Sequence, residues 1–189
     1  AEATPQLSAL SVEIDMPDRT FAQGDIASWG NQVPDSEAFE NWTAISGITV
    51  TANQIANPIN GQVTADLVEK TAQSFRRINK FVFHNDAGTY VASLYAKAHT
   101  NTKVSILYGK ADLSQYVIGR WDLSTASLIG AFKVGSATYD NASISAIGTD
   151  GWYRVSITGT FTFDTTGLFF IYPDNYSSTN AGGVYIWGA

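Results

Sequence analysis

The sequence predicts an all-β protein, built as a two-sheet antiparallel β-sandwich. Two features of the composition favour this class: 15% of the 189 residues are charged, and 13% are aromatic. Charged residues make up about 25% of a typical globular protein. Aromatic and β-branched side chains pack well on a pleated sheet, and the 16 glycines supply turns between short strands.

The third observation is alternation of apolar and polar residues in short segments separated by turn residues, as in half-buried strands. The predicted strands are Gly47–Ala52, Val63–Val68, Asn79–His84, Tyr90–Ala98, Lys103–Tyr108, Tyr116–Asp122, Leu128–Lys133, Ala142–Ile147, Trp152–Phe163, Leu168–Tyr172 and Gly183–Trp187. Turn signals lie at residues 85–88, 112–114, 149–151 and 173–175. Strands at this spacing are typical of a sandwich or barrel. The stretch Ala65–Arg77 allows at most one helix or turn.

Residues 1–30 differ from the rest and are predicted to form an N-terminal arm or linker. Ser11–Asp15 alternates like a strand, but Pro17 and Gly24 interrupt the pattern that follows. We place the domain boundary near Gly30–Asn31 and predict a single binding domain over residues 31–189.

Charge and hydropathy exclude several classes of partner. The formal net charge of -6 argues against nucleic acid and against an anionic membrane surface. No apolar run approaches the roughly 20 residues of a membrane helix, so we predict a soluble chain without membrane insertion. The absence of cysteine removes disulfides, thiolate metal sites and cysteine nucleophiles.

The sequence carries few of the groups that catalysis needs. His84 and His99 are the two histidines, and both are expected at strand ends facing solvent. No nucleophile elbow, phosphate-binding glycine loop or zinc-binding helix motif occurs. We therefore predict that the chain is not an enzyme, and we assign no catalytic residue.

Five aspartates fall in predicted turns, where this residue usually caps its own backbone. Carboxylates gathered from loops could also ligate calcium. Structural calcium therefore stays open, with no metal ligand assigned among Asp86, Asp112, Asp150, Asp164 and Asp174.

The aromatic residues are the remaining candidates for a binding surface. A ring beside a hydrogen-bonding side chain suits a sugar, which presents C–H faces and hydroxyl edges. In Tyr90–Ala98 one face carries Ser93, Tyr95 and Lys97, and this mixed face can be solvated or hold a polar ligand. Arg120 beside Trp121 is a second candidate for an exposed polar and aromatic surface.

Tyr172 and Tyr176 bracket a loop and form another candidate platform, and Tyr108 completes the predicted ligand-binding set. For all these residues, a place in the core or on a plain surface is the alternative. By contrast, the strands that hold the remaining large rings alternate tightly, so we predict core or hinge positions for Trp152, Tyr153, Tyr185 and Trp187.

Several short motifs together resemble the jelly-roll domain of bacteriophage tail and tail-fibre proteins, which is similar in fold to carbohydrate-binding modules. They follow one another at residues 35–42, 48–53, 57–61, 64–66, 95–98, 121–125, 151–156 and 184–189. A segment of the arm, Ile14–Arg19 followed by Gly24–Asp25, resembles phage tail-tip and host-attachment proteins.

The resemblance implies a lectin-like domain that binds a cell-surface or extracellular polysaccharide, on a virion tail or a secreted polysaccharide-active enzyme. It implies no catalytic residue, and it makes Trp152 and Trp187 packing anchors. The first alternative is a structural or trimerisation domain of a tail fibre, in which copies of the chain form a homo-oligomer. The second alternative is a jelly-roll polysaccharide lyase or depolymerase.

Overall fold

The computed structural model describes residues 31–83, 86–162 and 166–189. A short 3-10 helix, η2 (Phe39–Asn41), precedes the strands. The strands are β1 (Thr43–Ala44), β2 (Ile48–Ala56), β3 (Val63–Lys70), β4 (Ile78–Phe83), β5 (Gly88–Ala98), β6 (Lys103–Lys110), β7 (Tyr116–Asp122), β8 (Ser127–Val134), β9 (Thr138–Ile147), β10 (Trp152–Phe161), β11 (Thr166–Tyr172) and β12 (Gly182–Trp187).

The predicted strands and the observed strands agree closely. Each predicted segment has a counterpart from β2 to β12, and the predicted bounds of β7 are those observed. The two-residue strand β1 was not predicted. The prediction that Ala65–Arg77 could hold a helix or turn is wrong for its first half. Residues 65–70 belong to β3, which pairs with β2 and β12. The predicted arm, residues 1–30, lies outside the described residues.

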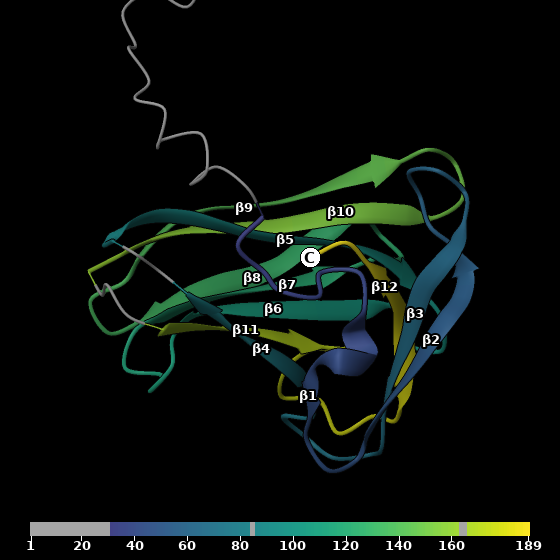
Figure 1. The fold of residues 1–189 in the computed structure, drawn as a ribbon, viewed down its shortest axis with the longest axis horizontal. Coiled ribbons are helices and arrows are strands. Elements are labelled where there is room, and N and C mark those ends of the chain that lie inside the picture. The colour runs from purple at the N-terminus through teal and green to yellow at the C-terminus, as the bar shows by residue number, and fades with distance from the viewer. Residues whose placement is uncertain (1–30, 84–85, 163–165) are drawn as a thin grey trace, which may run out of the picture. The chain divides into compact units, whose positions relative to one another are not determined.

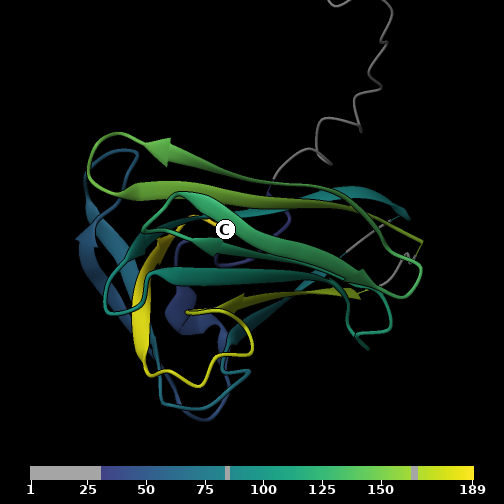
Figure 2. The same ribbon diagram turned by 180° about the vertical axis from the view of Figure 1, so that it is seen from behind.

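The strands form two antiparallel six-stranded sheets packed as a β-sandwich, as predicted (Figure 1). Sheet A has the order β1-β4-β11-β6-β7-β8, and sheet B has the order β2-β3-β12-β5-β10-β9. The chain passes between the sheets, so the central strands run β4-β11-β6-β7 in one and β3-β12-β5-β10 in the other. This alternation is the strand order of a jelly roll. The reverse view shows the same two layers (Figure 2).

The core lies between the sheets and takes one face of each strand. In β5 the buried residues are Ala92, Leu94 and Ala96, at the alternate positions that a strand turns to one side. Val155 and Ile157 of β10 join the same cluster. The other face of β5 and β10 therefore points away from the core.

A buried carboxylate ties the N-terminal part of this domain to sheet B. Asp66 of β3 is 1% exposed and accepts backbone N–H groups from Phe39 (3.0 Å) and Asn53 (2.9 Å). Burial raises the pKa of Asp66 above its usual 3.8, although the two backbone hydrogen bonds oppose the shift. Asp66 thereby fixes η2 and the bulged part of β2 against β3.

Candidate functional site

The outer face of sheet B carries a row of large side chains across five strands. The register sets Tyr185 beside Leu67 on one side and Lys97 on the other. Lys97 is in turn paired with Trp152, and Trp152 with Ile147. Side chains that are directly opposite on one face of a sheet lie within contact distance, so this row is a continuous strip.

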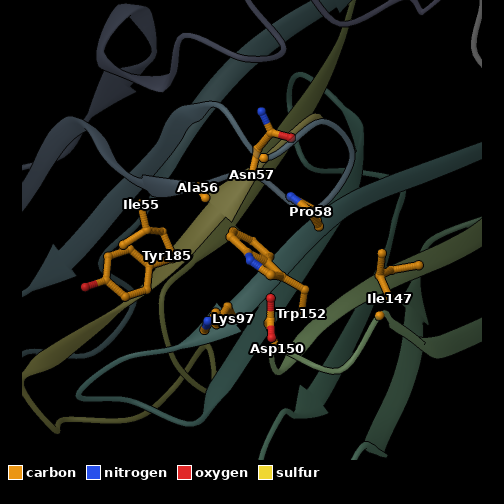
Figure 3. Close-up of a pocket in the computed structure, with 11 residues that line it drawn as sticks. Ile55, Ala56, Asn57, Pro58, Lys97, Ile147, Asp150, Trp152 and Tyr185 are labelled. Carbon is orange, nitrogen blue, oxygen red and sulfur yellow. The ribbon is translucent and has the colours of Figure 1, made fainter.

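Two hairpins rise on either side of this strip and enclose a pocket of about 470 Å³. The first wall is the end of β2 and the tip between β2 and β3, and the second wall is the turn between β9 and β10 (Figure 3). The pocket is lined by Ile55, Ala56, Asn57, Pro58, Gly61, Lys97, Ile147, Gly148, Asp150, Trp152 and Tyr185. Pockets of this kind, mostly apolar with a few polar groups, are typical ligand sites.

The β2–β3 tip, residues 57–62, is organised by one side chain. The Asn57 Oδ1 atom accepts the backbone N–H groups of Ile59 and Asn60, both at 3.0 Å. Its Nδ2 atom donates to Asn60 Oδ1 at 2.6 Å and to Thr64 Oγ1 at 2.8 Å. Because the polar atoms of the Asn57 side chain bond within the β2–β3 hairpin, Asn57 shapes the wall and leaves recognition of a ligand to other groups.

The rings of the pocket have different degrees of exposure. Trp152 is 4% exposed and forms the floor, where it packs with Trp187 and Ala65. Tyr185 is half-buried, and its ring lies 4.9 Å from that of His99. Tyr185 therefore offers more aromatic surface to a ligand than Trp152 does.

One cation and one anion complete the pocket. Lys97 projects from β5 between Tyr185 and Trp152, and Asp150 lies in the opposite turn (Figure 3). Within the described ranges, neither charge has an ion-pair partner. The pocket thus offers an ammonium donor and a carboxylate acceptor near exposed aromatic surface.

Beyond the pocket, the outer face of sheet B becomes polar. Arg154 is paired with Tyr95, and its guanidinium lies 5.8 Å from the Tyr95 ring centre. The Arg154 Nη2 atom donates to Ser93 Oγ at 3.3 Å. In the next row, the hydroxyls of Ser143 and Ser156 lie 2.8 Å apart. This strip of hydroxyls and one guanidinium extends the face along the strands.

Three predicted site residues share this face. Ser93, Tyr95 and Lys97 occupy alternate outward positions of β5. Lys97 lines the pocket, while Tyr95 packs on Trp187 with ring centres 5.5 Å apart. Whether these residues bind a ligand stays a prediction.

Two predicted site residues lie in the core, which corrects their placement on a surface. Trp121 is fully buried, because neighbouring residues of a strand point to opposite faces and Arg120 takes the outer one. The Trp121 ring lies across Gly119, where the missing side chain leaves room. Tyr108 is 5% exposed and packs against Phe161 and Phe169.

The other three predicted residues lie on the outer face of sheet A, away from the pocket. Arg120 stacks on Phe132, with its guanidinium 5.9 Å from the ring centre. Tyr172 is 5% exposed, so it offers no open platform, and burial raises its pKa to about 12. Tyr176 is half-buried, with its ring centre 5.9 Å from that of Tyr172.

The pocket contains residues that the sequence interpretation assigned elsewhere. Tyr185 was expected in the core or at a hinge, and Asp150 was expected to cap its turn, with calcium ligation left open. The core position expected for Trp152 is confirmed, since its side chain is buried in a hydrophobic cluster, but its ring also lines the pocket. The signal that could have found the pocket residues is the alternation of side chains between the two faces of a strand. It puts Trp152 and Arg154 on one face of β10, and Lys97 and Tyr95 on one face of β5. Sequence alone does not say which faces of different strands lie together on one side of a sheet.

Among the described residues, no group of three or more His, Asp or Glu side chains could hold a metal ion. His99 is exposed and packs on Tyr185, while His84 and Asp164 lie outside the described residues. No helix in the described part of the chain is long and apolar enough to span a membrane.

No protein-family model matches the chain, and no curated protein sequence is detectably similar. Among solved structures, the fold is similar to the enzymatically active domain of tailspike protein 4 of bacteriophage CBA120. The TM-score is 0.42 and the sequence identity is 14%. The likeness covers 84% of this chain and 20% of that one, so this chain spans about a fifth of the tailspike chain.

The similar structure is a phage tailspike domain. It does not identify a particular jelly-roll family. The prediction that the chain is not an enzyme is corrected, because the similar domain is described as enzymatically active. A likeness at this TM-score transfers neither an activity nor a ligand to this chain.

Proposed function

We propose that this chain is a glycan-binding domain of a phage tail or host-attachment protein, exposed on the virion tail. The observation that carries the proposal is the pocket on sheet B, where Tyr185 offers ring surface beside Lys97. A sugar ring stacks its C–H face on an aromatic ring, while its hydroxyls bond to polar groups at the edge. The Lys97 ammonium and the Asp150 carboxylate are a donor and an acceptor suited to those hydroxyls.

The adjoining surface supports a ligand longer than one sugar. Beyond the pocket, the same face of β5, β10 and β9 carries a row of paired serines, Ser93, Ser156 and Ser143. Hydroxyl side chains on a flat face can exchange hydrogen bonds with a polysaccharide that lies along the strands. The proposed ligand is therefore a polysaccharide chain, bound across the face with one ring in the pocket.

The test is a glycan array followed by calorimetric titration of the best ligand with matched variants. We expect Tyr185→Ala to weaken binding about tenfold, since contact with one large ring contributes about 1.5 kcal/mol or more. The control is Tyr176→Ala, which removes a half-buried ring that packs on the opposite sheet. Circular dichroism of both variants checks that the fold persists.

The pair of variants also locates the site. Loss of binding in Tyr176→Ala with full binding in Tyr185→Ala would move the site to sheet A and end the proposal for this pocket. The predicted alternative, a structural or trimerisation domain, is tested by sedimentation of the same protein. A stable trimer with no glycan bound would favour that alternative. Release of new reducing ends during the titrations would reveal cleavage of the glycan.

A further inference from the structure

Two cations stand on the outer face of sheet B at its centre. Lys97 and Arg154 occupy outward positions of the neighbouring strands β5 and β10. The other outward residues that pair between these strands carry no acid or base: they are Thr89, Val91, Ser93, Tyr95, Trp152, Ser156, Thr158 and Thr160. In a chain of net charge -6, the centre of this face is locally positive.

The two cations are close enough to act on one ligand group. Lys97 is paired with Trp152, and Arg154 is paired with Tyr95, so Lys97 and Arg154 are diagonal neighbours. Such neighbours are separated by about 7–8 Å, and their Cβ atoms by somewhat less. Long, flexible side chains can converge from that separation on a single anionic group.

Neither cation is neutralised by the part of the protein that the structure describes. Ion pairs there join Lys70, Lys80, Lys103 and Lys110 to aspartates, and none includes Lys97 or Arg154. The Arg154 guanidinium is held by Ser93 and by the Tyr95 ring, which leaves most of its five N–H donors for a ligand. An anchored, uncompensated guanidinium is a strong receptor for an anion.

The acids of this face lie at its margins. Asp150 is in the β9–β10 turn at one wall of the pocket, and Glu69 is on β3 near the opposite edge. Asp140 on β9 accepts the Thr160 hydroxyl at 2.8 Å. His99 packs on Tyr185. The three carboxylates can accept hydrogen bonds from sugar hydroxyls, but they repel an anion. They therefore favour placement of an anionic group away from the margins, between Lys97 and Arg154.

We infer that the glycan bound on sheet B is acidic, with an anionic substituent of a sugar ring held between Lys97 and Arg154. The inference rests on the proposed glycan-binding function and specifies its substrate class. The substituent is a carboxylate, a sulfate or a phosphate, because all three accept hydrogen bonds from an ammonium and a guanidinium.

The experiment is a glycan array in which neutral, carboxylated, sulfated and phosphorylated glycans are compared on one surface with the full chain. The strongest signals are expected from one acidic class, which identifies the substituent. The best polysaccharide is then titrated beside a derivative whose acidic group has been reduced or removed. Binding of the neutral derivative is expected to be weaker by about tenfold or more, since hydrogen bonds to charged groups are the stronger ones.

Two variants assign the effect to these cations. Lys97→Gln and Arg154→Gln are each expected to weaken binding of the acidic glycan about tenfold and to reduce its dependence on salt. Each substitution is expected to cost less affinity for the neutral derivative than for the acidic glycan. The control is Lys133→Gln, which removes an exposed lysine from β8 of sheet A and should change nothing.

The outcomes separate this inference from the proposed function. Signals from neutral glycans alone would overturn the acidic substrate class. Full affinity for the acidic glycan in both Gln variants would overturn the site between Lys97 and Arg154. Either result would leave glycan binding in place. An array with no signal at all would overturn both. If Lys133→Gln weakens acidic-glycan binding as much as Arg154→Gln does, the glycan is attracted by the positive charges of the protein in general. That result would also overturn the site.

Discussion

At the scale of single residues, one glycine decides where the largest core side chain lies. A Cβ atom on Gly119 would come within 2.3 Å of the Trp121 ring. Atoms do not approach this closely, so the indole can occupy its place only because residue 119 has no side chain. Gly119 makes room for the buried Trp121 ring, while strand alternation turns the neighbouring Arg120 outward.

We expect Gly119→Ala to destabilise the protein by about 1–3 kcal/mol, the usual cost of forcing extra atoms into a packed core. The measurement is the free energy of unfolding in urea, followed by tryptophan fluorescence. The control is Gly88→Ala, because a Cβ atom there would meet Tyr90 at an ordinary 3.7 Å. Equal stability of the two variants would contradict the role given to Gly119.

At the scale of elements, the pocket depends on the ends of two hairpins. The β2–β3 tip is stabilised by Asn57, and its backbone is closed by a 2.8 Å hydrogen bond from Asn57 N–H to Gln62 O. The opposite turn contains Gly148 and Gly151, both with positive φ, which favours glycine. When the walls are already rigid, less free energy is lost in ordering them as a ligand binds. The structure of the hairpins therefore influences the affinity for the ligand.

We expect Asn57→Ala to weaken glycan binding although its polar side-chain atoms bond only within the hairpin. The substitution removes hydrogen bonds to Ile59, Asn60 and Thr64 and should cost about 1–2 kcal/mol of stability. Hydrogen exchange of the Ile59 and Asn60 amides should accelerate.

The control for the hairpin prediction is Gln54→Ala on β2, whose exposed side chain bonds, among the described residues, to Ala52 O alone. It should leave exchange in the tip unchanged. Unaltered exchange at Ile59 in Asn57→Ala would show that the tip does not need this side chain.

At the scale of the whole molecule, buried phenols link stability to alkaline pH. Burial raises the pKa of Tyr108 and raises that of Tyr172 to about 12, although Arg77 opposes the latter shift. A group whose pKa is higher in the folded state stabilises that state below its unfolded pKa of 10. This contribution is lost as the pH rises from 10 towards 12.

We therefore expect the free energy of unfolding to fall between pH 10 and pH 12, with Tyr172 contributing about 2–3 kcal/mol. Tyr172→Phe should show a smaller fall over the same range. The measurement is urea unfolding at a series of alkaline pH values, beside the tyrosinate absorbance. An identical pH dependence in the wild type and in Tyr172→Phe would exclude Tyr172 as the source.

The amino-acid sequence determined the fold class and the strands, because alternation and turn residues are local and hold whatever the neighbours are. It also determined which side chains share one face of a strand, as Ser93, Tyr95 and Lys97 do in β5. Only the tertiary structure decided which faces meet. Sheet order set Lys97 between Tyr185 and Trp152 and gave the pocket its hairpin walls, while Trp121 and Tyr108 went to the core. Strand pairing joins residues far apart in the chain, and no local pattern specifies it.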